Sequence, residues 1–138
     1  MHDAKREREP IGHGMRTLLV DDDRLDRQLI CRLLKDSDPS VDVKEAPDAI
    51  AAFEALDCEE FDCLLVDQHM PGIIGTEFIR AVRDMESGPR KPILMVSGEK
   101  ASKLTIEEAL GAGGDFFIAK QDLTAKRLKA ALRCFGQG

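Results

Sequence analysis

The stretch TLLVDDDRLDRQLICRLL, residues 17–34, indicates which fold the chain adopts. It begins with a short apolar run, Thr17 to Val20, which ends at three consecutive aspartates. An amphipathic helix is then indicated by apolar residues at three- and four-residue spacing, at Leu25, Leu29, Ile30, Leu33 and Leu34. An aspartate at the head of such a helix can accept hydrogen bonds from its exposed N–H groups. The stretch therefore predicts one strand followed by one helix.

The same strand–helix unit is repeated along the rest of the chain. Further strands are predicted at residues 41–43, 61–66, 92–96 and 116–119. Pro47 is expected at the first position of the second helix, and a glycine-rich stretch, residues 111–114, is expected to end the fourth. The helices are indicated by the apolar positions Ile50, Phe53, Leu56, Phe78, Ile79, Val82, Leu104, Ile106, Leu110, Leu128, Ala131, Leu132 and Phe135. Five such units predict an α/β fold, a parallel sheet with helices on both faces.

Length and composition fit a single domain. The chain has 138 residues, and 43% of them are hydrophobic, enough for a core without a metal or a disulfide. We expect residues 1–15 to form a disordered N-terminal tail or linker and residues 16–138 to form the domain. The net charge of −6 argues against direct nucleic-acid binding, which needs a basic face.

Cysteine usage and hydropathy favour a cytoplasmic location. Cys31, Cys58, Cys63 and Cys134 form no Cys-x-x-Cys pair, so we expect reduced thiols rather than a zinc site. Cys31 and Cys63 lie within apolar runs and are expected to be buried. No apolar run approaches the roughly 18 residues of a membrane-spanning helix, so no membrane insertion is expected.

Polar residues stand where the predicted strands end. Asp21, Asp22 and Asp23 follow the first strand, and Asp67 follows the third. The fourth and fifth strands end at Ser97 and Lys120. The carboxyl ends of parallel strands share one edge of the sheet, where ligands bind in folds of this class. We therefore expect these side chains to lie close together.

This combination of groups is suited to phosphoryl chemistry. Crowded carboxylates repel one another, and a hard divalent cation relieves the repulsion; oxygen ligands favour Mg²⁺, with Mn²⁺ as an alternative. An aspartate can act as a nucleophile toward phosphorus, while a cation, a lysine and a hydroxyl hold the equatorial oxygens. An aspartate after a strand is more often a turn residue or helix cap, and Asp23 is expected to be such a cap.

At this point the sequence closely resembles the response-regulator receiver family of two-component signalling, in its chemotaxis-regulator-like form. The resemblance rests on LLVDD (residues 18–22) and on LLVDQHMPG (residues 64–72) followed by Gly75. It extends through residues 93–98 and 109–120, and covers roughly residues 16–135. It implies a five-stranded, flavodoxin-like (βα)5 fold with strand order 2-1-3-4-5.

The resemblance implies a role for each acidic residue. Asp67 matches the phosphoacceptor, which would receive its phosphoryl group from a histidine kinase or a histidine phosphotransfer protein. Mg²⁺ would bind Asp22 directly, Asp21 through water, Asp67 and the backbone carbonyl of His69. The chain would then be a signalling protein that supports its own phosphorylation and dephosphorylation, not a dedicated metabolic enzyme.

The resemblance also implies a switch. Ser97 matches the switch hydroxyl, Gly98 keeps the path of the phosphoryl group open, and Lys120 matches the phosphate-contacting lysine. Phe117 matches the aromatic residue that moves inward once Ser97 binds the phosphoryl group. The surface altered for a downstream effector would be the fourth helix, fifth strand and fifth helix, with Lys100, Lys103, Glu107, Phe117 and Lys126.

One position departs from the family pattern. Gln121 stands where the family usually has proline, often after a cis bond. Because a cis bond before a non-proline residue costs about 3–4 kcal/mol, we expect a trans bond here. The departure leaves the course of the chain after Lys120 open.

Parts of the same pattern also occur in two other kinds of protein. A haloacid-dehalogenase-type phosphatase would use the Asp-x-Asp motif of Asp21 and Asp23. Against it, position 25 is leucine where that family usually has threonine or valine, and the loop at residues 67–72 would be unexplained. A pseudo-receiver that serves only as a binding module would be expected to lack one of the acids, the hydroxyl or the lysine, and none is missing. This alternative stays open only for an intact site that its surroundings hold shut.

Overall fold

Short apolar runs form the strands of a central parallel sheet. The computed structural model describes residues 14–98 and 103–136, with residues 103–105 and 134–136 described through the backbone alone. In this part of the chain the strands are β1 (Arg16–Val20), β2 (Asp42–Ala46), β3 (Cys63–Asp67), β4 (Ile93–Ser97) and β5 (Phe116–Ala119). They form one five-stranded sheet in the order β2-β1-β3-β4-β5. The predicted fold class and strand order are confirmed.

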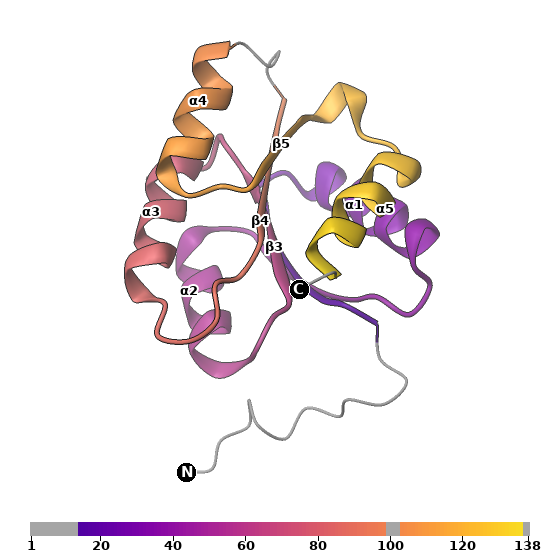
Figure 1. Ribbon diagram of the computed structural model, residues 1–138, viewed down its shortest axis with the longest axis horizontal. Helices are drawn as coiled ribbons and strands as arrows, with labels where there is room; N and C mark the ends of the chain where they lie inside the picture. The colour runs from indigo at the N-terminus through magenta and orange to yellow at the C-terminus, as the bar shows by residue number, and fades with distance from the viewer. Residues whose placement is uncertain (1–13, 99–102, 137–138) are drawn as a thin grey trace.

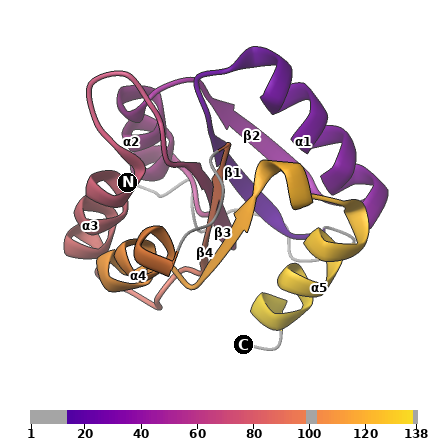
Figure 2. The same ribbon diagram turned by 90° about the horizontal axis from the view of Figure 1, so that it is seen from above.

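Helices cover both faces of this sheet. They are α1 (Arg24–Ser37), α2 (Ala49–Cys58), α3 (Gly75–Met85), α4 (Lys103–Ala112) and α5 (Ala125–Gly136), with the short 3-10 helix η2 (Lys120–Asp122) after β5. Figures 1 and 2 show α2, α3 and α4 on one face and α1 with α5 on the other. None of the described helices is long and apolar enough to cross a membrane.

Alternate residues of β1, β3 and β4 pack into two separate cores. Leu18 and Val20 of β1 point into the core beneath α2, α3 and α4, whereas Leu19 points into the core beneath α1 and α5. Because side chains alternate along a strand, an unbroken apolar run is the sequence of a strand covered on both faces. Because both faces of the sheet are packed, the residues at the carboxyl ends of its strands are held in defined positions.

Four of the apolar residues that indicated the helices are exposed rather than packed in the core. Leu25 and Leu29 of α1 are 74% and 51% exposed, while Ile30 and Leu34 carry its contact with the core. Residues 29 and 30 point roughly 100° apart on a helix, so the sheet and α5 cover only one of the two apolar stripes. Ile50 in α2 is also exposed, because Ala52 and Ala55 make the core contact there. Leu110 of α4 behaves in the same way beside the buried Ala109 and Ala112.

The start of α2 also differs from the prediction. Pro47 is not the first helical residue, because Asp48 is the N-cap and its side chain accepts a hydrogen bond from Ala51 N. An aspartate cap satisfies an exposed N–H group and therefore outweighs the preference for proline at the first turn. Asp23 caps α1 as predicted. β2 extends three residues beyond its predicted end, to Ala46, and β4 begins at Ile93.

The burial of the cysteines agrees with the prediction in part. Cys63 is buried as predicted, but Cys31 is only half-buried, because it lies beside the stripe of α1 that faces the core. Cys31, Cys58 and Cys63 are free thiols, and the side chain of Cys134 lies outside the description. No cis peptide bond occurs among the described residues, as predicted for the bond before Gln121. Residues 1–13 and 99–102, with Lys100, lie outside the described residues.

Candidate functional site

The register of the sheet brings the polar strand ends to one edge. Val20 of β1 pairs with Val66 of β3, so that Asp21 and Asp67 are the next residues on neighbouring strands. Ser97, the last residue of β4, pairs with Ala119 of β5, and Lys120 follows directly. The residues predicted from strand ends are therefore gathered at the carboxyl-terminal edge of the sheet.

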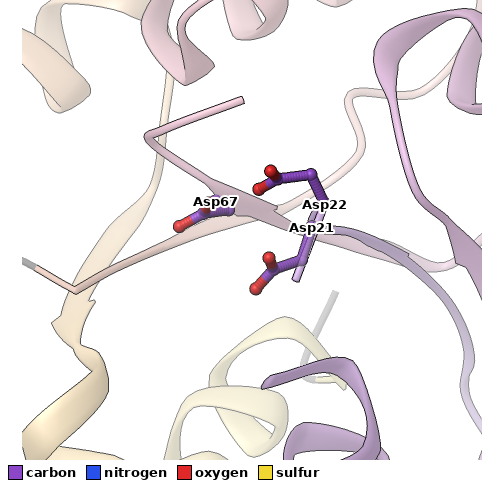
Figure 3. Close-up of side chains that lie close together, drawn as sticks. All are labelled: Asp21, Asp22 and Asp67. Carbon is purple, nitrogen blue, oxygen red and sulfur yellow. The ribbon is translucent and has the colours of Figure 1, made fainter. Parts of the chain in front are cut away.

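Asp21, Asp22 and Asp67 form a compact acidic cluster, which we call the acidic triad. Each offers a carboxylate oxygen, and these oxygens lie within 4.8 Å of one another. Figure 3 shows Asp21 and Asp22 extending from the end of β1 toward the same side as Asp67 of β3. Asp21 and Asp67 are buried, at 1% and 5% exposure, whereas Asp22 is exposed. Solvent can therefore reach the cluster from the side of Asp22.

Local hydrogen bonds fix Asp21 in this cluster. Its backbone N–H donates to the carbonyl of Ala46 at 3.1 Å, which continues the pairing of β1 with β2. Its Oδ1 accepts a 2.9 Å hydrogen bond from Asp23 N. Its buried Oδ2 lies 2.8 Å from Lys120 Nζ, an ion-pair contact outside hydrogen-bond geometry. This oxygen therefore keeps the capacity to bind a further donor or a cation.

The surroundings of Asp67 change its proton affinity. Burial raises the pKa of Asp67 to about 6, and the negative charges of Asp21 and Asp22 add to this effect. The ammonium of Lys120, 3.3 Å from Asp67 Oδ1, opposes it. A carboxyl group with a pKa near 6 is still mostly ionised at neutral pH, and a cation bound beside it would lower that pKa.

Lys120 is the cationic member of the site. Burial by itself would lower its pKa, but contacts with Asp21 and Asp26 and the charge of Asp67 outweigh burial and raise the pKa above its ordinary value. The ammonium is therefore charged throughout the physiological range. Lys120 is the first residue of η2, so Gln121 lies within this short helix.

Asp26 is a member of the site that the sequence did not predict. It lies in the first turn of α1, and its Oδ2 accepts a 2.6 Å hydrogen bond from Lys120 Nζ. The sequence offered one signal, an acidic residue one turn beyond the Asp21–Asp23 run. That signal is weak, because acidic residues are favoured in any first helical turn by the helix dipole.

The loop between β3 and α3 is held by tight backbone packing. Gly75 N donates to the carbonyl of Gln68 at 2.7 Å, and Thr76 N donates to the side-chain Oε1 of Gln68 at 3.1 Å. Gly72 has φ +84°, a conformation that favours glycine. His69, two residues after Asp67, is exposed. The loop thereby has a defined course directly after Asp67.

The other predicted residues border the same edge. Ser97 is fully buried at the end of β4, and Gly98 follows it. A Cβ built at Gly98 would lie 4.0 Å from Lys120 Cδ, which places this glycine beside the lysine. Phe117 lies farther back along β5, paired with Met95 and half-buried against the core beneath α4. Ser97, Gly98 and Lys120 thus lie together, and Phe117 lies behind them.

The acidic triad fits a hard divalent cation. All of its donors are carboxylate oxygens, the ligand type that such cations prefer. One of these oxygens, Asp21 Oδ2, is buried without a hydrogen bond, and the neighbouring charges repel. A cation among the three carboxylates would bind Asp21 Oδ2 and would relieve the repulsion between the neighbouring charges.

Comparison with known proteins agrees with this geometry. The chemotaxis protein CheY of Pseudomonas aeruginosa is 38% identical over 115 residues, covering 83% of this chain and 90% of the relative. The chemotaxis protein CheY-3 of Vibrio cholerae is 33% identical over 122 residues, covering 88% and 92%. The solved structure of the chemotaxis response regulator CheY4 of Vibrio cholerae is 27% identical. It superimposes with a TM-score of 0.76, over 88% of this chain and 98% of that one.

The family model of the response regulator receiver domain matches residues 17–133, which include the acidic triad, Ser97 and Lys120. Receiver domains are signalling domains, so the phosphatase alternative loses its basis. Fold, site geometry and relatives agree: the chain belongs to the response regulator receiver domain family of two-component signalling.

Proposed function

We propose that this protein receives a phosphoryl group on Asp67 from the phosphohistidine of a histidine kinase or a histidine phosphotransfer protein, in a Mg²⁺-dependent reaction. The proposal rests chiefly on one observation. The Asp67 carboxylate is buried at the end of β3 between two other carboxylates and the ammonium of Lys120, 3.3 Å away. A nucleophile and a countercharge for the incoming group are therefore adjacent.

The transfer exchanges one bond to phosphorus for another. An Asp67 oxygen attacks the phosphorus, the O–P bond forms, and the P–N bond breaks. The electron pair of that bond returns to the imidazole nitrogen of the donor, which then takes a proton from solvent. Because the pKa of Asp67 is about 6, most of its carboxylate is ionised and nucleophilic at neutral pH. Lys120 attracts a peripheral phosphoryl oxygen.

Mg²⁺, or Mn²⁺ in its place, would be held by Asp22, Asp67 and the backbone carbonyl of His69, and by Asp21 through water. When bound, the cation offsets the negative charge on the nucleophile and on the phosphoryl group. Two features support this ligand set, the buried Asp21 Oδ2 and the fixed course of the loop that carries His69.

The output of phosphorylation would be a change at α4, β5 and α5 that a downstream effector recognises. Ser97 would donate a hydrogen bond to the phosphoryl group, Gly98 would leave its path open, and Phe117 would move inward behind Ser97. The half-buried position of Phe117 supports a ring that can move in either direction. We place this signalling function in the cytoplasm, where histidine kinases have their catalytic parts.

Intact mass spectrometry after treatment with acetyl phosphate and Mg²⁺ tests the proposal. The wild-type protein should gain one phosphoryl group, and the gain should require Mg²⁺. Asp67→Asn should gain none, while Asp36→Asn, an exposed change on α1, should behave as the wild type does. A pseudo-receiver would gain none in any variant, and equal labelling of Asp67→Asn would overturn the assignment.

A further inference from the structure

Asp26 contacts the lysine of the site from a different element. It lies in the first turn of α1, and its Oδ2 is 2.6 Å from Lys120 Nζ at the far end of the chain. Its side chain is 37% exposed, whereas the side chains of Asp21 and Asp67, which also contact this ammonium, are 1% and 6% exposed. Asp26 is therefore the contact of Lys120 that solvent can reach most easily.

Three carboxylates surround the ammonium of Lys120, and Asp26 is the one that accepts a hydrogen bond from it within the described residues. The distances from Nζ are 2.6 Å to Asp26, 2.8 Å to Asp21 and 3.3 Å to Asp67. The two shortest contacts draw the ammonium toward α1 and β1, away from the carboxylate that would carry the phosphoryl group.

We propose that Asp26 is a resting-state partner of Lys120 that competes with the phosphoryl group for the ammonium, and so weakens the phosphorylated state. The proposal rests on the proposed phosphorylation of Asp67. A phosphoryl oxygen on Asp67 has to draw the ammonium of Lys120 away from its short hydrogen bond with Asp26. Asp26, as the more exposed partner, is the one that yields its hydrogen bond at least cost.

Charge acts in the same direction. Asp21, Asp26 and Asp67 contact the ammonium of Lys120, and Asp22 adds a fourth negative charge beside Asp21 and Asp67. Phosphorylation replaces the single charge of Asp67 with up to two. A nearby carboxylate opposes that added charge, but it favours a bound cation. Removal of the Asp26 charge should therefore strengthen the binding of a phosphoryl group and weaken the binding of Mg²⁺, two effects of opposite sign.

These opposite effects separate competition from a structural role. A carboxylate in the first turn also stabilises a helix through the helix dipole. Loss of that effect would lower stability, but it would not strengthen anion binding and weaken cation binding in the same variant. Asp36→Asn removes one negative charge from an exposed position on the same helix, away from Lys120, and is the matched control.

Calorimetric titration tests the proposal, and it suits a chain without tryptophan or tyrosine. Beryllofluoride, which mimics a phosphoryl group on aspartate, is titrated into Mg²⁺-saturated wild type, Asp26→Asn, Asp26→Ala and Asp36→Asn. Mg²⁺ alone is titrated into the same proteins. Asp26→Asn keeps a hydrogen-bond acceptor without charge, and Asp26→Ala removes both.

Both Asp26 variants should bind beryllofluoride roughly 3- to 5-fold more tightly than wild type, as expected for a partly exposed ion pair. They should bind Mg²⁺ roughly 2-fold more weakly. Asp36→Asn should match wild type in both titrations. Unchanged or weaker beryllofluoride binding by the Asp26 variants, beside normal binding by wild type, would overturn this inference alone. Failure of folded wild type to bind beryllofluoride would overturn the proposed function and this inference with it.

Discussion

Lys120 Nζ and Asp67 Oδ1 lie 3.3 Å apart and link the ends of β5 and β3. β4 lies between these two strands and ends at Ser97, which is fully buried. A group attached to Asp67 would therefore have Lys120 on one side. The strand end that carries the Ser97 hydroxyl lies beside it. The site is built from strand ends whose separation is fixed by hydrogen bonding within the sheet.

Asp67→Asn should stabilise the metal-free protein at neutral pH by about 1–2 kcal/mol, because the buried, repelled carboxylate is removed. The folded-state pKa of about 6 lies above 3.8, the ordinary pKa of an aspartate. Ionisation of Asp67 therefore lowers stability as pH rises from about 4 through 6. Urea unfolding in EDTA at several pH values measures this: the difference from wild type should vanish near pH 4. A destabilised Asp67→Asn at pH 7 would contradict the raised pKa.

Asp22→Asn should weaken Mg²⁺ binding by about 10-fold or more, because the proposed site loses a charged ligand. Calorimetric titration of Mg²⁺ measures the affinity, and phosphorylation by acetyl phosphate should slow in parallel. The metal-free variant should be more stable than wild type, since repulsion within the acidic triad falls.

Asp23→Asn is the control for this change. Asp23 caps α1 through hydrogen bonds from Leu25 N and Asp26 N, and asparagine is an equally good cap. It removes the same charge one residue away, but outside the acidic triad. Equal Mg²⁺ affinity for Asp22→Asn and wild type would exclude Asp22 as a ligand.

Gly75→Ala should destabilise the protein by about 2 kcal/mol, because overpacking forces a backbone shift. A Cβ at this position would lie 2.6 Å from the Asp67 carbonyl oxygen and 2.8 Å from Gln68 Cα. The displaced loop should also weaken Mg²⁺ binding. Gly111→Ala is the contrasting change: a Cβ there meets nothing within 4 Å, so alanine within α4 should stabilise by about 0.5–1 kcal/mol. Thermal unfolding of both variants checks the two signs.

The sequence predicts the edge of the sheet better than the helices around it. Each of four polar residues stands at the end of an apolar run: Asp21, Asp67, Ser97 and Lys120. Because the strands that these runs form are parallel, their carboxyl ends meet at one edge of the sheet. Helical periodicity, in contrast, identifies apolar stripes without showing which one is covered. Leu25 and Leu29 are exposed because α5 and the sheet cover the neighbouring stripe.

Asp26 could not be predicted for a related reason. Its partner, Lys120, is 94 residues away, and the contact depends on how α1 lies against the end of β5. A local pattern shows an acidic residue in a first helical turn, and the helix dipole explains that residue without any partner. The start of α2 is also predicted wrongly from a local pattern. Pro47 suggests the first helical residue, but the side chain of Asp48 caps the helix and determines where it begins.

The switch is tested by the position of the Phe117 ring. Phe117 lacks a hydroxyl group, so its inward position needs no polar partner, and a fraction of the resting protein is expected to have the ring inward. NMR spectra of the phenylalanine rings with Mg²⁺, before and after beryllofluoride, should show Phe117 moving in wild type. In Ser97→Ala the movement should be reduced, because the bound group loses its hydrogen-bond donor. A ring with the same surroundings in both states of the wild type would refute the switch.

The most direct measurement is identification of the residue that carries the phosphoryl group. The protein is treated with acetyl phosphate and Mg²⁺, and then with borohydride, which reduces an aspartyl phosphate to homoserine. Tandem mass spectrometry of the digest then locates the reduced residue. We predict homoserine at position 67 alone, and none when Mg²⁺ is withheld. Homoserine at position 21 or 22, or a phosphoryl group retained on His69 or Ser97 with Asp67 unmodified, would contradict the assignment.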